Sequence, residues 1–348
     1  MNFSNWGIVG YNDNTGLGEQ NRDIKNVLGL KYHFVINSQK LKNNRICPKS
    51  DFLLSENTSQ DDINKLFKKI EGLIFVENPG WHPLVLPTAK KFGIKTVCIV
   101  NWEWFNSKGT DWRKLDCLIA PTNYTARVLN KFGFKNTIQL DNPVSLKNLP
   151  ERNIKGLPRL FVHNAGLIDH DDRKSTKLVL ESFQNTKERD IKLLINCQKD
   201  PALEFNDKRI ELIVGNKKSK KELYEYGDVL IQPSKMEGLG LSILEGVCTG
   251  IPVITTNYPP MNQWVWHKKL LVKTKLFEKK SFSNKAAGIS QAYLKIPSKW
   301  HLSKIISWCA KNEMDNFSEK NREWAIKHFN ASTLKKSWEN SLELFFND

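Results

Sequence analysis

This chain contains two series of short apolar runs of strand length, and in each series the runs alternate with helical patterns. A polar stretch separates the two series. Such alternation is typical of βαβ units, in which helices connect parallel strands and cover the sheet. The first series predicts strands at 6–10, 32–37, 73–76, 96–100, 117–120 and 137–140. The second series predicts strands at 159–163, 192–196, 210–214, 229–232 and 252–255.

Helical patterns occupy the intervals between these strands, at 61–70, 84–92, 124–132, 176–183 and 220–226, and from residue 281 onward we expect helices only. The stretch 142–158 is polar, contains Pro and Gly, and suits a linker. A chain of 348 residues also exceeds the usual size of one domain. We therefore expect an α/β protein with two Rossmann-like, doubly wound parallel-sheet domains at 1–150 and 151–330.

The cysteines and the apolar runs indicate the cellular compartment of such a protein. Six cysteines are scattered without a C-x-x-C pair, and several lie in apolar strand-like runs, where a thiol acts as a small hydrophobe. No apolar run approaches the length of a membrane span, and the first ten residues lack the basic and apolar regions of a secretory signal. These features predict a reduced, cytoplasmic protein.

The formal net charge of +16 is the unusual bulk property. It is explained either by attraction to an anionic partner, such as a nucleotide diphosphate, an acidic membrane face or nucleic acid, or by a general preference for Lys across the surface. The basic residues are spread along the chain, with mild clustering at 217–221 and 268–280. Both explanations stay open.

The segment 232–256 carries the most chemical information. It is predicted to form a strand, a loop with Gly238 and Gly240, a helix and another strand. Glycines let the backbone approach a ligand closely, and the amides that open a helix attract phosphate or sugar oxygens. In parallel α/β sheets, ligands bind at the carboxyl ends of the strands, where this loop must lie.

Two carboxylates flank that helix start. Glu245 is the only charged residue between Gly238 and Trp266, and burying it needs partners such as the vicinal hydroxyls of a ribose. Glu237, on the loop, is placed to meet the sugar end of the same ligand. The alternative is that Glu237 is a surface loop residue and that Glu245 pairs with a structural cation.

From Pro233 to Ile254 the segment closely resembles the signature of glycosyltransferase family 4, P-S-x-x-E-G-x-G-L-x-x-x-E followed by G-x-P-V-I. The resemblance implies a GT-B fold, transfer with retention of anomeric configuration, and no metal or other cofactor. It assigns the donor sugar to Glu237 and the nucleotide ribose to Glu245. It also places the loop residues Gly238, Leu239, Gly240 and Leu241 at the donor.

An upstream segment, 160–176, resembles the first loop of that family's C-terminal domain, in which an Arg and a Lys hold the diphosphate. Gly166 would lie at this donor loop, and Arg173 and Lys174 would be the diphosphate ligands and act in catalysis. An acidic insertion, Asp169–Asp172, departs from the family pattern. Asp-x-Asp is also the metal site of the unrelated GT-A enzymes, but the two-domain pattern favours a polar loop here.

Three further places are weaker candidates. Gly16 and Gly18 follow the first strand and match the family's N-terminal glycine loop near the donor, although a tight βα turn explains them equally. Asn101 and Glu103, within the aromatic sequence 101–105 after a strand, suit an acceptor sugar or a base, or else a core with a surface carboxylate. Lone histidines such as His82 and His163 are more often structural.

The tail carries Trp338, Leu342, Phe345 and Phe346 at near-helical spacing, and in GT-B enzymes the last helix returns to the N-terminal domain, here about 331–348. The combined hypothesis is a retaining, metal-independent transferase that moves a hexosyl-type sugar from a nucleotide sugar to a glycan, lipid-linked or other acceptor. Peripheral contact with an anionic membrane or nucleic acid would use the basic surface. The alternatives are a transferase acting on modified DNA bases, a nucleotide-sugar epimerase, and a non-catalytic nucleotide-sugar binding module.

Overall fold

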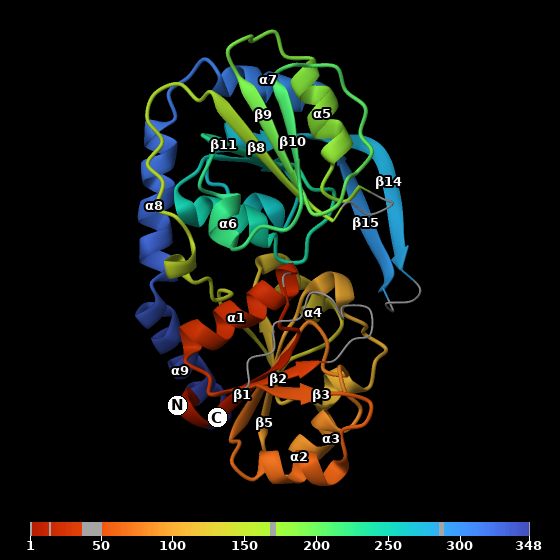
Figure 1. Ribbon diagram of the computed structural model, residues 1–348. Helices are drawn as coiled ribbons and strands as arrows, with labels where there is room; N and C mark the ends of the chain where they lie inside the picture. The colour runs from red at the N-terminus through yellow and green to blue at the C-terminus, as the bar shows by residue number, and fades with distance from the viewer. Residues whose placement is uncertain (1, 14, 37–50, 168–171, 285–288, 348) are drawn as a thin grey trace. The chain divides into compact units, whose positions relative to one another are not determined.

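The structure is a computed structural model that describes residues 2–13, 15–36, 51–167, 172–284 and 289–347 (Figure 1). Its chain divides into two compact units. Unit 1 comprises residues 1–145, 284–290 and 331–348, and unit 2 comprises residues 146–283 and 291–330.

Unit 1 contains a parallel sheet in the order β3-β2-β1-β4-β5-β6-β7. Its strands are β1 (Trp6–Gly10), β2 (Tyr32–Ile36), β3 (Phe52–Leu54), β4 (Gly72–Val76), β5 (Lys95–Ile99), β6 (Cys117–Ala120) and β7 (Thr137–Gln139). Its helices are α1 (Gly16–Leu28), α2 (Gln60–Phe67), α3 (Val85–Lys91), α4 (Asn123–Lys131) and α9 (Ala331–Asn347). Every residue of β1 and β4 is buried, as expected for central parallel strands covered on both faces.

The last helix, α9, belongs to unit 1, where it packs against α1 (Figure 1). Trp338 anchors it: the indole is fully buried, and its Nε1 donates to the carbonyl of Asp141 at 3.0 Å. The expected return of the terminal helix to the N-terminal half is confirmed.

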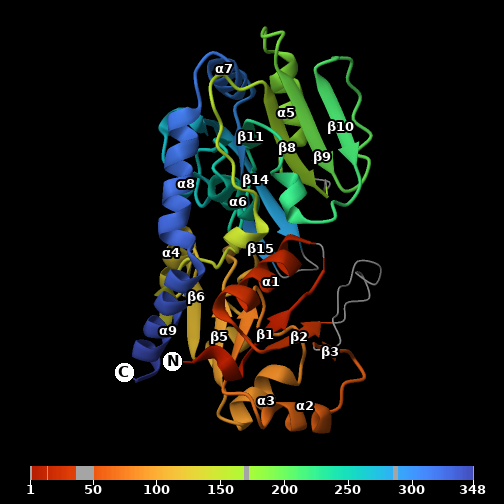
Figure 2. The same cartoon turned by 60° about the vertical axis from the view of Figure 1, so that its left-hand side comes forward.

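Unit 2 repeats the architecture with a parallel sheet in the order β10-β9-β8-β11-β12-β13 (Figure 2). Its strands are β8 (Leu160–Gly166), β9 (Lys192–Cys197), β10 (Ile210–Val214), β11 (Val229–Gln232), β12 (Val253–Thr256) and β13 (Leu271–Val272). Its helices are α5 (Thr176–Gln184), α6 (Leu241–Thr249), α7 (Lys299–Cys309) and α8 (Asp315–Phe329). The predicted pair of doubly wound parallel sheets is confirmed.

Two expectations are wrong. The region after residue 281 is not purely helical, because β14 (Thr274–Asn284) and β15 (Ile289–Pro297) pair in a two-stranded sheet (Figure 1). Apolar and polar residues alternate along 291–296, a period of two that favours a strand. The second wrong expectation is the helix at 220–226. Only a 3-10 turn forms there, at Lys220–Leu223, and both Lys220 and Tyr224 are buried.

Within the described parts of the chain, no helix combines the length and apolar character needed to cross a bilayer. The described cysteines are buried and form no disulfide with one another: Cys98, Cys117, Cys197, Cys248 and Cys309. Cys47 lies outside the described residues.

Candidate functional site

The candidate site forms where two neighbouring strands of unit 2 end. β8 and β11 run parallel and adjacent, so the loops that follow them, around Arg173 and around Glu237, emerge at the same edge of the sheet. A backbone hydrogen bond ties the loops together, because Lys235 N donates to Arg173 O at 2.8 Å. Segments more than 60 residues apart in the sequence thus meet at one place.

Glu237 is the centre of this cluster. Its carboxylate accepts from Lys174 Nζ at 2.7 Å and lies 3.5 Å from Arg173 Nη1. Only 5% of the residue is exposed. Burial by itself would raise the pKa of Glu237, but the charges of Lys174 and Arg173 outweigh it and bring the pKa down to about 2. Glu237 is therefore ionised at neutral pH. The structure brings together the three residues that the sequence selected as catalytic.

Lys174 also links this cluster to the start of α6, because its Nζ lies 3.2 Å from Ser242 Oγ. The residue before the helix, Gly240, has φ +78°, which favours glycine, and no side chain caps the helix. Trp264 fixes the preceding turn by donating its Nε1 to the carbonyl of Leu239 at 2.7 Å. First-turn amides lack partners within a helix and attract anions, so a cationic side chain and a helix start lie at one place.

Glu245 is bound by residues of its own domain. Lys220 Nζ lies 3.0 Å from Oε1, Tyr224 donates its hydroxyl to Oε2 at 2.8 Å, and the Lys220 and Glu245 side chains are only 5% and 6% exposed. The expectation that ligand hydroxyls are needed to satisfy this carboxylate is wrong, and the structural cation considered as the alternative is present. Each carboxylate oxygen can accept more than one hydrogen bond, so the contacts do not exclude a ligand.

Sequence reasoning missed Lys220, Tyr224 and Ser242. The signal for Lys220 was the mildly basic run 217–221, but nothing in that run distinguishes the lysine that is buried from those that stay exposed. Its partner lies 25 residues away, so only tertiary structure pairs them.

The acidic insertion is described only at its end, and Asp169–Asp171 lie outside the described residues. Asp172 accepts from the amides of Thr176 at 2.7 Å and Lys177 at 3.1 Å, so it caps α5. Gly166 ends β8 with φ +62°, which favours glycine. In the described residues, no group of three or more His, Cys, Asp or Glu side chains is arranged to hold a metal ion.

The glycine loop of unit 1 has a structural role at Gly18. A Cβ there would lie 2.3 Å from the carbonyl oxygen of Asp13, whereas nothing lies within 4 Å of a Cβ at Gly16. Asp13 holds this turn, because its Oδ1 accepts from Thr15 N at 3.0 Å. Close packing therefore explains Gly18, as the tight-turn alternative proposed.

We expect Gly18→Ala to lower the free energy of unfolding of unit 1 by about 1–3 kcal/mol, because the backbone of Asp13 must move to admit the methyl group. The matched variant Gly16→Ala is expected to change it by less than about 0.5 kcal/mol. Urea unfolding of both proteins checks the difference. Equal destabilisation by the two substitutions would contradict this account of the loop.

Asn101 and Glu103 lie at the carboxyl end of β5 and are 6% and 7% exposed. Asn101 donates its Nδ2 to Glu77 Oε1 at 3.2 Å. Glu77, which sequence reasoning missed, follows β4 and has φ +71°, a conformation that non-glycine residues seldom adopt. In the sequence, the polar residues that directly follow the strand 72–76 could have indicated Glu77 as a candidate. The alternative considered from the sequence, a surface position for Glu103, does not hold, because the residue is buried.

Both histidines considered from the sequence are held by local hydrogen bonds. His82 lies 3.1 Å from the carbonyl of Ser55. His163 is fully buried on β8, with Nδ1 2.7 Å from Ile231 O and Nε2 3.0 Å from Thr176 Oγ1. Burial lowers the pKa of His163 to about 4, and the charge of Lys174 adds to the effect. The burial and hydrogen bonds of His163 are consistent with the structural interpretation.

A pH dependence follows from His163. The unfolded imidazole takes up a proton near pH 6.5, but the folded one does so only near pH 4, so the unfolded state binds more protons in between. We expect unit 2 to lose up to about 3 kcal/mol of stability as the pH falls through this window. Urea unfolding at a series of pH values should show a shallower loss for His163→Gln. An unchanged slope in that variant would contradict the assignment.

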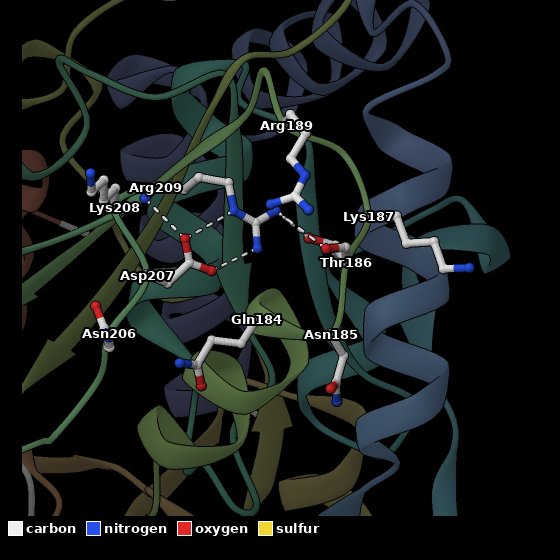
Figure 3. A pocket seen from close by; sticks show the side chains of 9 residues that line it. All are labelled: Gln184, Asn185, Thr186, Lys187, Arg189, Asn206, Asp207, Lys208 and Arg209. Carbon is white, nitrogen blue, oxygen red and sulfur yellow. Dashed lines mark hydrogen bonds and ion pairs between the residues drawn. The ribbon is translucent and has the colours of Figure 1, made fainter.

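A separate pocket of about 710 Å³ lies in unit 2 around the loops that precede β9 and β10 (Figure 3). This is the amino edge of the sheet, opposite the edge that carries Glu237. Its central cation, Arg209, binds Asp207 and the carbonyl of Thr186 (Figure 3). Arg209 also donates to the carbonyl of Glu188. The guanidinium thus supports the end of α5 rather than remaining available to a ligand.

Two doubly wound parallel sheets, with the terminal helix returned to the first, define the GT-B fold. Residues 159–291, which contain the Glu237 cluster, match the family model described as glycosyl transferases group 1. No curated protein sequence gives a significant match.

The fold is shared with solved structures of low sequence identity. Anabaena HepE, in complex with UDP and glucose, has a TM-score of 0.68 and 11% identity, covering 97% of this chain and 99% of the other. A glycosyltransferase from Rickettsia africae has a TM-score of 0.66 and 13% identity, with 98% of each chain covered. Sucrose-phosphate synthase from Thermosynechococcus elongatus has a TM-score of 0.64 and 12% identity, with 99% of each covered.

Proposed function

We propose that this chain is a glycosyltransferase whose unit 2 binds a nucleotide-sugar donor. The observation that carries the proposal is the cluster of Arg173, Lys174 and Glu237 beside the uncapped start of α6. Two cations and a helix N-terminus form a site suited to a diphosphate. The match of this same region to group 1 glycosyl transferases supports it.

In the proposed reaction, negative charge develops on the leaving diphosphate as the glycosidic bond of the donor breaks. Arg173, Lys174 and the first amides of α6 stabilise that charge, so the chemistry needs no metal. Glu237 holds both cations in place and binds hydroxyls of a hexosyl-type donor sugar. Transfer with retention of configuration follows the resemblance to glycosyltransferase family 4 and belongs to the proposal.

Glu245 is proposed to bind the ribose while Lys220 and Tyr224 fix its carboxylate. Because HepE was solved with UDP-glucose, UDP-sugars are the first donors to test. For the acceptor, we propose the carboxyl ends of β4 and β5 in unit 1, where Glu77, Asn101 and Glu103 offer acceptors for hydroxyl hydrogens.

The test is a panel of UDP-, GDP- and ADP-sugars, scored first by thermal stabilisation of the full chain and then by release of the nucleotide with and without acceptor sugars. A bound donor is expected to raise the melting temperature, since it binds only the folded state. Product analysis separates the alternatives: an epimerase converts the donor without any acceptor, and a binding module is stabilised without turnover. Transfer only to modified DNA would favour the DNA-base transferase. Failure of every nucleotide sugar to stabilise the protein would overturn the proposal.

A further inference from the structure

Unit 2 carries an exposed face of tryptophan and lysine that the proposed reaction does not use. We define the tryptophan–lysine face as Trp266, Trp300, Trp308, Lys269, Lys304 and Lys320. It lies on α7, on the start of α8 and on the segment before β13; α7 and α8 are the blue helices of unit 2 in Figures 1 and 2.

The helix α7 is amphipathic in an unusual way. One side buries Leu302, Ile305 and Ile306 in unit 2. The opposite side presents Trp300, Lys304 and Trp308 at four-residue spacing, so these side chains lie in one row along the helix. Trp300 is 70% exposed, the highest value among the large hydrophobic side chains of the described residues. Most of the Trp300 side chain is therefore in contact with water.

Contacts join the other members into one continuous surface. Lys269 Nζ lies 4.8 Å from the ring centre of Trp308, and Lys320 Nζ lies 4.8 Å from that of Trp266. Trp266 and Trp308 both pack on Phe317, at ring distances of 5.6 and 5.9 Å. Trp266 is itself 44% exposed.

The face is electropositive. Glu181 and Glu188 pair with Lys299 and Lys311 at its margins, but across the described ranges no ion pair is formed by Lys269, Lys304 or Lys320. The pKa values of two nearby histidines are lowered by burial and also by neighbouring lysines. Burial lowers the pKa of His267, and Lys269 and Lys320 lower it further. Lys273 and Lys304 act in the same way on the pKa of His301, after burial.

We propose that the tryptophan–lysine face docks on the surface of an anionic lipid bilayer. Indole rings prefer the interface between water and hydrocarbon, and lysines near an anionic bilayer are attracted to its headgroups. The sequence has no arginine between Arg209 and Arg322. Nucleic-acid phosphates are typically held by the bidentate arginine fork, whereas lysine acts as a point charge that suits a fluid array of headgroups. The chemistry of the face therefore favours a bilayer over a nucleic acid.

The experiment is flotation of the full chain with vesicles of phosphatidylcholine alone or with about 30% phosphatidylglycerol, at low salt and at about 0.5 M NaCl. We expect binding to the anionic vesicles only, weakened by salt. The variant Lys269→Glu/Lys304→Glu is expected to lower the partition coefficient at least tenfold, roughly what two reversed charges remove. Trp300→Ser should lower it at either salt concentration, because it removes the apolar anchor.

The control is Lys65→Glu/Lys69→Glu, which makes the same change in net charge at exposed positions of unit 1. It is expected to bind vesicles like the unchanged protein, and melting temperatures verify that all variants are folded. Equal loss of binding in the control would show that total charge, and not this face, drives association. Absence of vesicle binding, or binding only to a DNA oligonucleotide through the same lysines, would overturn the proposal.

Discussion

Lys174→Ala is expected to reduce the rate of sugar transfer by about 100- to 1000-fold, the usual effect of removing one group that stabilises developing charge. Lys174 is the residue that contacts both Glu237 and Ser242, so its loss affects the diphosphate site and the start of α6 together. Steady-state kinetics with the donor identified by the panel measures the effect. The loss should appear mainly in kcat, since charge develops in the transition state.

The matched control is Lys177, three residues further along the chain. Lys177 is exposed in the first turn of α5, and Lys177→Ala removes one positive charge from the same segment without touching Glu237, so the activity of this variant is expected to stay within about twofold. Lys174→Ala also removes the nearer of the two cations beside the buried carboxylate of Glu237, which destabilises the fold. The double variant Lys174→Ala/Glu237→Gln removes both charges and is expected to regain stability without regaining activity. A folded Lys174→Ala protein with undiminished turnover would remove the residue from the mechanism.

Lys220→Met is expected to lower the free energy of unfolding of unit 2 by about 3–5 kcal/mol. The substitution leaves the Glu245 carboxylate buried with Tyr224 as its remaining described partner, and an uncompensated buried charge has a cost of this size. The neighbouring Lys221 is exposed, so Lys221→Met is the matched control and should change stability by less than about 0.5 kcal/mol. Urea unfolding measures both.

A second substitution separates the two roles of Glu245. Lys220→Met/Glu245→Gln removes the charge together with its partner, and stability is expected to recover to within about 1 kcal/mol of the unchanged protein. If Glu245 also binds the ribose, the same double variant should show a raised KM for the donor. Recovered stability with an unchanged KM would leave Glu245 a purely structural residue and would falsify its assignment to the nucleotide.

The sequence indicated much of the site because the relevant residues follow strands. β8 and β11 are apolar runs that end in polar, glycine-bearing loops, and parallel strands bring such loops to one edge. Arg173, Lys174 and Glu237 were selected because their segments resemble those of glycosyltransferase family 4, and the parallel strands explain why the two loops meet. The pairing of β14 with β15 was not predicted because the alternation of apolar and polar residues is short, at 291–296 only.

The sequence by itself determined the two parallel sheets, since runs of apolar residues with a repeated strand–helix spacing can be buried in few other ways. Only the tertiary structure decided how the buried charges are satisfied. Lys220 reaches Glu245 from a turn between β10 and β11, and Glu77 reaches Asn101 from the adjacent strand. A charge is stabilised by whatever lies within a few ångströms of it, and sequence spacing does not record distances between segments that meet only when the chain has folded.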